Sequence, residues 1–120
     1  MAKRILLCDD ETHILRAAEF KFKRAGYDVV CASDGQEGWE YLEGGGCACV
    51  IVLDLLMPRL DGRLFRKKQL ERKECASIPV VVFTATQAEM PDAVAVIRKT
   101  DPQSLLDTID RAASVPALTD

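Results

Sequence analysis

The residues of this chain best suited to chemistry are acidic side chains that stand directly after short apolar runs. Asp9 and Asp10 follow residues 5–8, and Asp54 follows residues 50–53. Three carboxylates that converge repel one another unless a cation lies among them. Oxygen ligands suit a hard divalent ion such as Mg²⁺, which keeps several waters when carboxylates bind it. These residues therefore predict a magnesium site.

A hydroxyl and an amine follow two further apolar runs. Thr84 comes after residues 80–83, and Lys99 comes after the weaker run 93–97. Beside a metal ion, these two donors would hold the oxygens of a phosphoryl group on a carboxylate nucleophile. Each residue alone has an ordinary explanation, because aspartate after a strand is commonly a turn former or helix cap, and lysine is usually solvated. Their combination in this order indicates a phosphoryl-transfer site.

The elements that must position these residues are short strands alternating with helices. The apolar runs have the length and β-branching of buried strands, and they cover residues 5–8, 27–31, 50–53, 80–83 and 93–97. Stripes with helical spacing lie between or after them, at residues 14–25, around Trp39 and Leu42, and at residues 105–113. This alternation predicts an α/β fold with right-handed β-α-β units and helices on both faces of a parallel sheet.

The candidate site falls at one edge of that sheet. In a doubly wound sheet, ligands bind at the carboxyl ends of the strands, beside the point where the strand order reverses. The polar residues that follow the strands all lie at this edge: Asp9, Asp10, Asp54, Thr84 and Lys99.

Composition limits the class of protein. The 120 residues suffice for one domain, which we expect to span residues 1–120. The net charge of −3 gives no general attraction for nucleic acid or anionic membrane. No apolar run reaches the roughly 18 residues of a membrane span, and the N-terminus has no hydrophobic signal core. We therefore expect a cytoplasmic protein that binds neither nucleic acid nor membrane.

The cysteines favour structural thiols over a metal site. Cys8 and Cys31 lie in apolar runs, where a thiol behaves as a small hydrophobic group. Cys47 and Cys49 form a Cys-X-Cys pair, but no second pair or partner histidine completes a four-ligand zinc site. A role for that pair is left open.

Three segments resemble the receiver domains of two-component response regulators. Residues 5–11, ILLCDDE, are similar to the opening of that family, and residues 78–85, IPVVVFTA, to its fourth strand and hydroxyl. Residues 54–62, DLLMPRLDG, have its highly specific acceptor pattern D-x-x-M-P-x-x-D-G. The resemblance covers nearly the whole chain. It implies a flavodoxin-like, doubly wound sheet of five parallel strands in the order 2-1-3-4-5.

The resemblance also implies a role for each site residue. Asp54 accepts the phosphoryl group from a histidine kinase or a histidine phosphotransfer protein. Thr84 contacts that group and moves on activation, and Lys99 pairs with it. Asp10 binds Mg²⁺ directly, and Asp9 does so mainly through water. The implied metal ligands are Asp9, Asp10, Asp54 and the backbone carbonyl of Leu56.

Three features depart from the family's pattern. Thr84 and Lys99 are only fifteen positions apart, about two helical turns fewer than usual. We therefore expect the fourth helix to be short or absent and residues 87–92 to form a loop or a single turn. The lysine is followed by Thr100 where the family has proline after a cis bond, so that bond is either trans, with Lys99 repositioned, or cis under strain. Val96 occupies the position of an aromatic switch residue, which predicts a different signalling route.

Other interpretations stay open beside the phosphoacceptor. A binding-only docking module, with phosphorylation vestigial, fits the missing helix, whereas the complete set of site residues argues against it. A phosphohydrolase of the haloacid-dehalogenase type needs a second aspartate two residues after the first, where this chain has Leu56. We expect no enzyme beyond the chain's own phosphoryl transfer and a slow self-dephosphorylation, since Leu56 and Thr86 hold water poorly. The basic stretch 59–73 is expected to form the solvated face of the third helix, with docking as its alternative.

Overall fold

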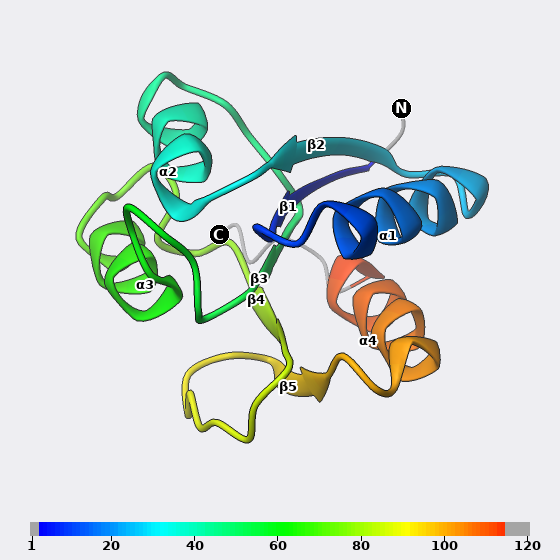
Figure 1. Cartoon of the computed structure of the whole chain (residues 1–120). Coiled ribbons are helices and arrows are strands. Elements are labelled where there is room, and N and C mark those ends of the chain that lie inside the picture. Colours follow the sequence, from blue (N-terminus) through cyan, green and yellow to red (C-terminus); the bar gives the residue numbers. More distant parts are fainter. Residues whose placement is uncertain (1–2, 115–120) are drawn as a thin grey trace.

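Strands and helices alternate along the chain as far as the fourth strand (Figure 1). The computed structural model describes residues 3–114. In chain order the elements are β1 (Arg4–Cys8), α1 (Thr12–Arg24), β2 (Asp28–Ala32), α2 (Gly35–Glu43), β3 (Val50–Leu53), α3 (Gly62–Leu70), β4 (Val80–Thr84), β5 (Ala95–Arg98) and α4 (Pro102–Ser114). All strand pairs are parallel, in the order β2-β1-β3-β4-β5. The predicted α/β fold and strand order are confirmed.

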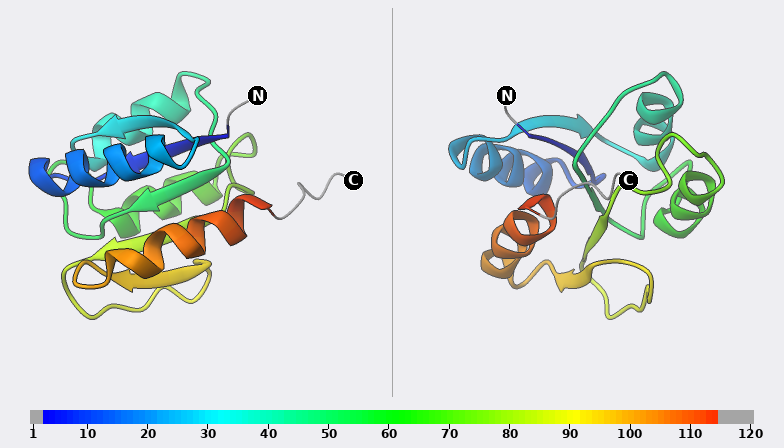
Figure 2. Two further views of the ribbon diagram at one scale, coloured as in Figure 1. Left: turned by 90° about the vertical axis from the view of Figure 1, so that its right-hand side faces the viewer. Right: turned by 180° about the vertical axis from the view of Figure 1, so that it is seen from behind.

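The sheet separates two apolar cores. Helices α1 and α4 cover one face, and α2 and α3 cover the other (Figure 2). Successive side chains of a strand point to opposite faces, so Leu6 and Ile51 pack with α2 and α3 while Ile5 and Val50 pack with α1 and α4. Strands β1, β3 and β4 are continuously apolar because both of their faces are covered.

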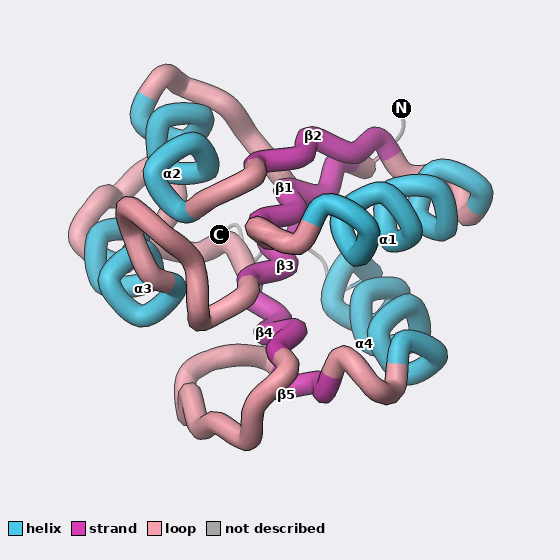
Figure 3. Tube along the Cα trace, viewed as in Figure 1, coloured by secondary structure: helices cyan, strands magenta, loops and turns pink. Residues whose placement is uncertain are grey.

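Residues 85–94, between β4 and β5, form a loop (Figure 3). This confirms the expectation that the family's fourth helix is short or absent in this chain. The loop packs against α3 instead of forming a helix. Met90 is 7% exposed within the core on that side of the sheet. The Arg63 guanidinium donates to the Glu89 carbonyl at 2.9 Å, and Arg66 Nε lies 3.2 Å from Asp92 Oδ2. Two arginines of α3 therefore hold the loop in place.

The prediction that the basic stretch 59–73 is a solvated face was wrong at Arg66. This side chain is buried, and its Nη1 donates to Gln69 Oε1 at 2.8 Å. The remaining basic residues of α3, Arg63, Lys67 and Lys68, are exposed or partly exposed. Arg66 is buried because the irregular loop carries polar groups, including the Asp92 carbonyl, that need a donor.

The limits of the strands differ from the predictions by at most two residues. The fifth strand covers Ala95–Arg98 instead of 93–97, and the second covers Asp28–Ala32. All five cysteines are free thiols; Cys8 and Cys75 are buried, and Cys47 is exposed. Of the helices that the structure describes, none is long and apolar enough to cross a membrane.

Candidate functional site

Asp9 and Asp54 lie side by side because the strands that precede them pair in register. Cys8, the last residue of β1, is opposite Leu53, the last residue of β3. The Asp54 N–H donates to the Cys8 carbonyl at 3.1 Å, which continues the ladder one residue beyond the strands. Asp9 is 1% exposed and Asp54 is 4% exposed. The sheet thus holds two buried carboxylates at its carboxyl edge.

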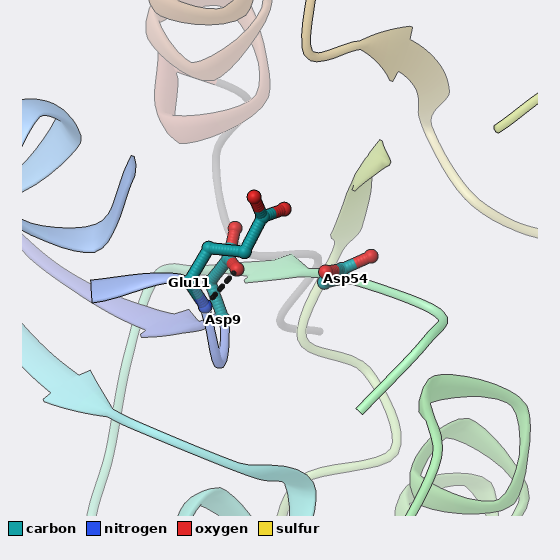
Figure 4. Close-up of side chains that lie close together, drawn as sticks. All are labelled: Asp9, Glu11 and Asp54. Carbon is teal, nitrogen blue, oxygen red and sulfur yellow. Dashed lines mark hydrogen bonds between the residues drawn. The ribbon is translucent and has the colours of Figure 1, made fainter. Parts of the chain in front are cut away.

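The third carboxylate of the cluster is Glu11, which the sequence analysis missed. Oxygens of Asp9, Glu11 and Asp54 lie within 4.8 Å of one another (Figure 4). The chain bends at residue 10, between β1 and α1, and Glu11, the N-cap residue of α1, has extended backbone. Asp10 is exposed and outside this cluster. No pattern of composition or spacing marks Glu11, because the direction of its side chain depends on the backbone between β1 and α1. Direct metal binding by Asp10 stays a prediction.

Lys99 brings its ammonium into the middle of these carboxylates. Its Nζ lies 2.6 Å from Glu11 Oε1, 2.9 Å from Asp54 Oδ2 and 3.0 Å from Asp9 Oδ1. Its backbone N–H donates to the Thr84 carbonyl at 2.8 Å. Residues 3–114 contain no cis peptide bond, so the bond to Thr100 is trans. A trans bond therefore still delivers the lysine to the predicted site.

The electrostatics of the site favour a charged lysine. Burial works against the Lys99 charge, but hydrogen bonds to Glu11, Asp9 and Asp54 together raise its pKa above the usual range. Burial raises the pKa of Asp9, and the Glu11 N–H and Lys99 offset this only in part. The hydrogen bond from Lys99 lowers the pKa of Glu11. Three carboxylates share one ammonium, so the ionised cluster carries a net charge of −2, which one divalent cation would match.

Thr84 places an unpaired hydroxyl in the interior. It is the last residue of β4 and fully buried, and its Oγ1 has no hydrogen-bond partner among the residues that the structure describes. Asp9 Oδ2 also lacks a hydrogen bond there, although it lies 2.9 Å from Lys99 Nζ as an ion pair. Buried polar atoms without partners cost stability and are rare. The Thr84 hydroxyl therefore indicates a site built to receive a polar ligand.

The segment after Asp54 is folded by the Asp61–Gly62 pair. A Cβ on Gly62 would lie 2.4 Å from the Asp54 carbonyl oxygen, so glycine is required for this close approach. Asp61 caps α3 by accepting the Leu64 N–H at 2.9 Å. Leu56 is 62% exposed, and its N–H lies 3.3 Å from Asp54 Oδ1. The acceptor pattern therefore encodes a turn that presents Asp54.

Comparison with known proteins gives a family and several relatives. Residues 5–110 match the model of the response regulator receiver domain. The chain is 39% identical over 89 residues to the alkaline phosphatase synthesis transcriptional regulatory protein PhoP of Bacillus subtilis, a match covering 74% of this chain and 36% of that protein. It is 35% identical over 89 residues to the transcriptional regulatory protein SrrA of Staphylococcus aureus, covering 74% and 35%. The chain thus spans about a third of the length of these curated relatives.

Solved structures share the fold. A CheY-like receiver domain protein from Methanospirillum hungatei superposes with a TM-score of 0.83 at 24% identity, covering 94% of each chain. The response regulator TrrA from Thermotoga maritima, solved in complex with Mg(2+)-BeF, gives 0.81 at 22% identity, covering 92% of this chain and 98% of that one.

Proposed function

Because this chain belongs to the response regulator receiver domain family of two-component signalling, we propose that it accepts a phosphoryl group on Asp54 and passes the event on by a change of conformation. The observation that carries the proposal is the contact between Lys99 Nζ and Asp54 Oδ2, at 2.9 Å. Thr84, whose carbonyl accepts the Lys99 N–H, adds a buried hydroxyl that has no hydrogen-bond partner among residues 3–114. This set supplies a nucleophile, a fixed positive charge and a hydrogen-bond donor.

The acidic pocket fits a magnesium ion. Its ligand atoms are oxygens, it carries excess negative charge, and Asp9 Oδ2 lacks a hydrogen bond. The residues that would hold the ion are Asp9, Asp10, Asp54 and the backbone carbonyl of Leu56. When bound, Mg²⁺ would neutralise charge on the phosphoryl oxygens. The TrrA complex named above supports this proposal for a protein of the same fold.

In the proposed reaction the donor is a phosphohistidine of a histidine kinase or phosphotransfer protein. A carboxylate oxygen of Asp54 attacks phosphorus, the new O–P bond forms as the N–P bond breaks, and the imidazole keeps the electron pair and takes up a proton. Lys99 holds a phosphoryl oxygen by charge, and the Thr84 hydroxyl donates to another. The chain's only further reaction is slow hydrolysis of its own acyl phosphate.

The remaining assignments follow from the same premise. We propose that residues 1–120 form a single receiver domain, of which residues 5–110 match the family. A cytoplasmic location fits a kinase partner, and the net charge of −3 argues against direct nucleic-acid binding by these residues. PhoP and SrrA are transcriptional regulators, but the matched segment is only about a third of each.

Intact mass after incubation with a small-molecule phosphodonor and Mg²⁺ tests the proposal. The wild type should gain the mass of one phosphoryl group, and Asp54→Asn should gain none because an amide is a poor nucleophile. Asp107→Asn, at an exposed position on α4, is the control and should be modified like the wild type. Phosphorylated Asp54→Asn would show that another residue is the acceptor.

A binding-only module is the second candidate. It is favoured by the loop at residues 85–94, which replaces a helix on the face that the family commonly uses for partners. A wild type that binds Mg²⁺ and yet gains no phosphoryl mass would support this candidate over the first.

A further inference from the structure

Glu11 lies at the start of helix α1, but its side chain does not cap that helix. It is the N-cap residue of α1, and its side chain makes no capping hydrogen bond. Serine, threonine, aspartate or asparagine usually occupies this position and accepts a backbone N–H. The Glu11 carboxylate instead contacts Lys99 Nζ at 2.6 Å, the shortest of the contacts of that ammonium. Its side chain therefore contacts the lysine of the acidic pocket instead of the helix backbone.

Lys99 competes with any cation for the same oxygens. Its ammonium contacts Asp9 and Asp54, the two buried carboxylates among the proposed metal ligands. A divalent cation that binds these oxygens must displace the ammonium from them and then repels it. Glu11 is 43% exposed and lies outside the proposed ligand set, so it can keep the ammonium without taking an oxygen from the cation.

We propose that Glu11 is a positioning residue for Lys99, and that this contact determines how tightly the pocket binds a divalent cation. The inference rests on the proposed function and deepens it, since it assigns a role to a side chain outside the family's acceptor and metal set. Without the Glu11 charge, the ammonium has only Asp9 and Asp54 as partners and holds both more firmly. Cation binding then weakens.

Calorimetric titration of the 120-residue chain with MgCl₂ tests this role. Glu11→Gln should weaken Mg²⁺ binding by roughly three- to tenfold, the size expected for one charge a few ångströms away that is screened about as strongly as in bulk water, because the Glu11 side chain is 43% exposed. Glu19→Gln is the matched control, because Glu19 is also on α1 and also pairs with a lysine, Lys23, at 2.9 Å. That variant should bind Mg²⁺ as the wild type does.

Two further variants separate positioning from simple charge. In a Lys99→Met background, Glu11→Gln should change the Mg²⁺ affinity by less than about twofold, because the coupling acts through Lys99. Glu11→Asp keeps the charge but is one methylene shorter, and it should weaken Mg²⁺ binding nearly as much as Glu11→Gln. This comparison does not require the Lys99→Met variant to fold.

The inference would be overturned if Glu11→Gln lost the same affinity for Mg²⁺ with and without Lys99, or if Glu11→Asp bound Mg²⁺ with full affinity. A wild type that does not bind Mg²⁺ would overturn both this inference and the metal site, whereas an unaffected Glu11→Gln overturns this inference alone.

Discussion

Leu56 is the exposed neighbour of the proposed acceptor, and it offers no polar atom on its side chain. It is 62% exposed, and its backbone N–H faces Asp54. Hydrolysis of an acyl phosphate needs a water held near phosphorus, so Leu56→Asn should speed phosphoryl loss by roughly tenfold. This is less than the about 10²–10⁴-fold that a positioned general acid or base contributes, because an amide can orient the water but cannot take its proton. The time course of phosphoryl loss, followed by intact mass, measures this.

The matched control for this change is Leu64→Asn on α3. Leu64 is 44% exposed, so the variant adds the same amide at an exposed position outside the pocket. Its decay should equal that of the wild type. Slower decay in Leu56→Asn than in the wild type would contradict the idea that Leu56 shields the phosphoryl group.

At the residue scale, sequence reasoning predicted that certain side chains gather at one edge of the sheet, but it did not identify all of them. Asp9, Asp54 and Lys99 were predicted because polar residues after parallel strands must share one edge, and the structure brings them together. Glu11 was missed because it stands after a visible acidic pair. Its place depends on backbone direction between β1 and α1, which composition and spacing do not encode.

At the scale of elements, the loop at residues 85–94 depends on α3 for its conformation. Arg66 donates to the Asp92 carboxylate and carbonyl and to the buried Gln69 side chain. Arg66→Met keeps the apolar stem but leaves the Gln69 oxygen without this donor, which should cost about 1–3 kcal/mol of folding free energy. Hydrogen exchange should quicken at residues 85–94, as at the Ala93 N–H that donates to the Met90 carbonyl, and stay slow in β1.

Lys67→Met is the matched control, since Lys67 is the next residue on α3 and is exposed. It should change neither the thermal midpoint nor the exchange of the loop. If Arg66→Met and Lys67→Met behave alike, Asp92 and Arg66 do not hold the loop.

The loop also shows how far an element can be predicted. The fifteen-residue spacing from Thr84 to Lys99 is about two helical turns shorter than the family usually has, so a short or absent helix followed from counting. The burial of Arg66 could not be predicted from the sequence in the same way. A basic run predicts a solvated helix face unless an irregular segment, here Asp92 and its neighbours, brings unpaired polar groups against it.

At the scale of the whole molecule, the sheet buries charge at the edge that the site uses. Burial raises the pKa of Asp9 because the charged form loses its hydration. The folded protein therefore holds that proton more tightly than the unfolded chain. The contribution of Asp9 is favourable below the usual pKa of an aspartate and is lost as the pH rises through the raised pKa. At neutral pH, Asp9 thus opposes folding when no metal is bound.

Asp9→Asn should accordingly stabilise the metal-free protein. Near neutral pH its thermal midpoint should rise, by roughly 3–6 °C for each kcal/mol that the burial of the Asp9 charge costs in a domain of this size. Lys99 keeps Glu11 and Asp54 as partners in this variant. The advantage should shrink as the pH falls toward about 4, the usual range of an aspartate, and thermal melts across this range measure it.

Magnesium should reverse the order of the two proteins. Binding to the folded state alone stabilises by mass action, about 2.7 kcal/mol at a hundredfold excess over the dissociation constant, so Mg²⁺ should raise the wild-type midpoint while Asp9→Asn gains much less. Asp107→Asn, exposed on α4, should follow the wild type in both conditions. A wild type that is more stable than Asp9→Asn without metal would mean that the Lys99 ion pair outweighs the burial of Asp9. The charged Asp9 side chain would then stabilise the metal-free fold through Lys99. Mg²⁺ binding would have no unfavourable burial free energy of Asp9 to offset.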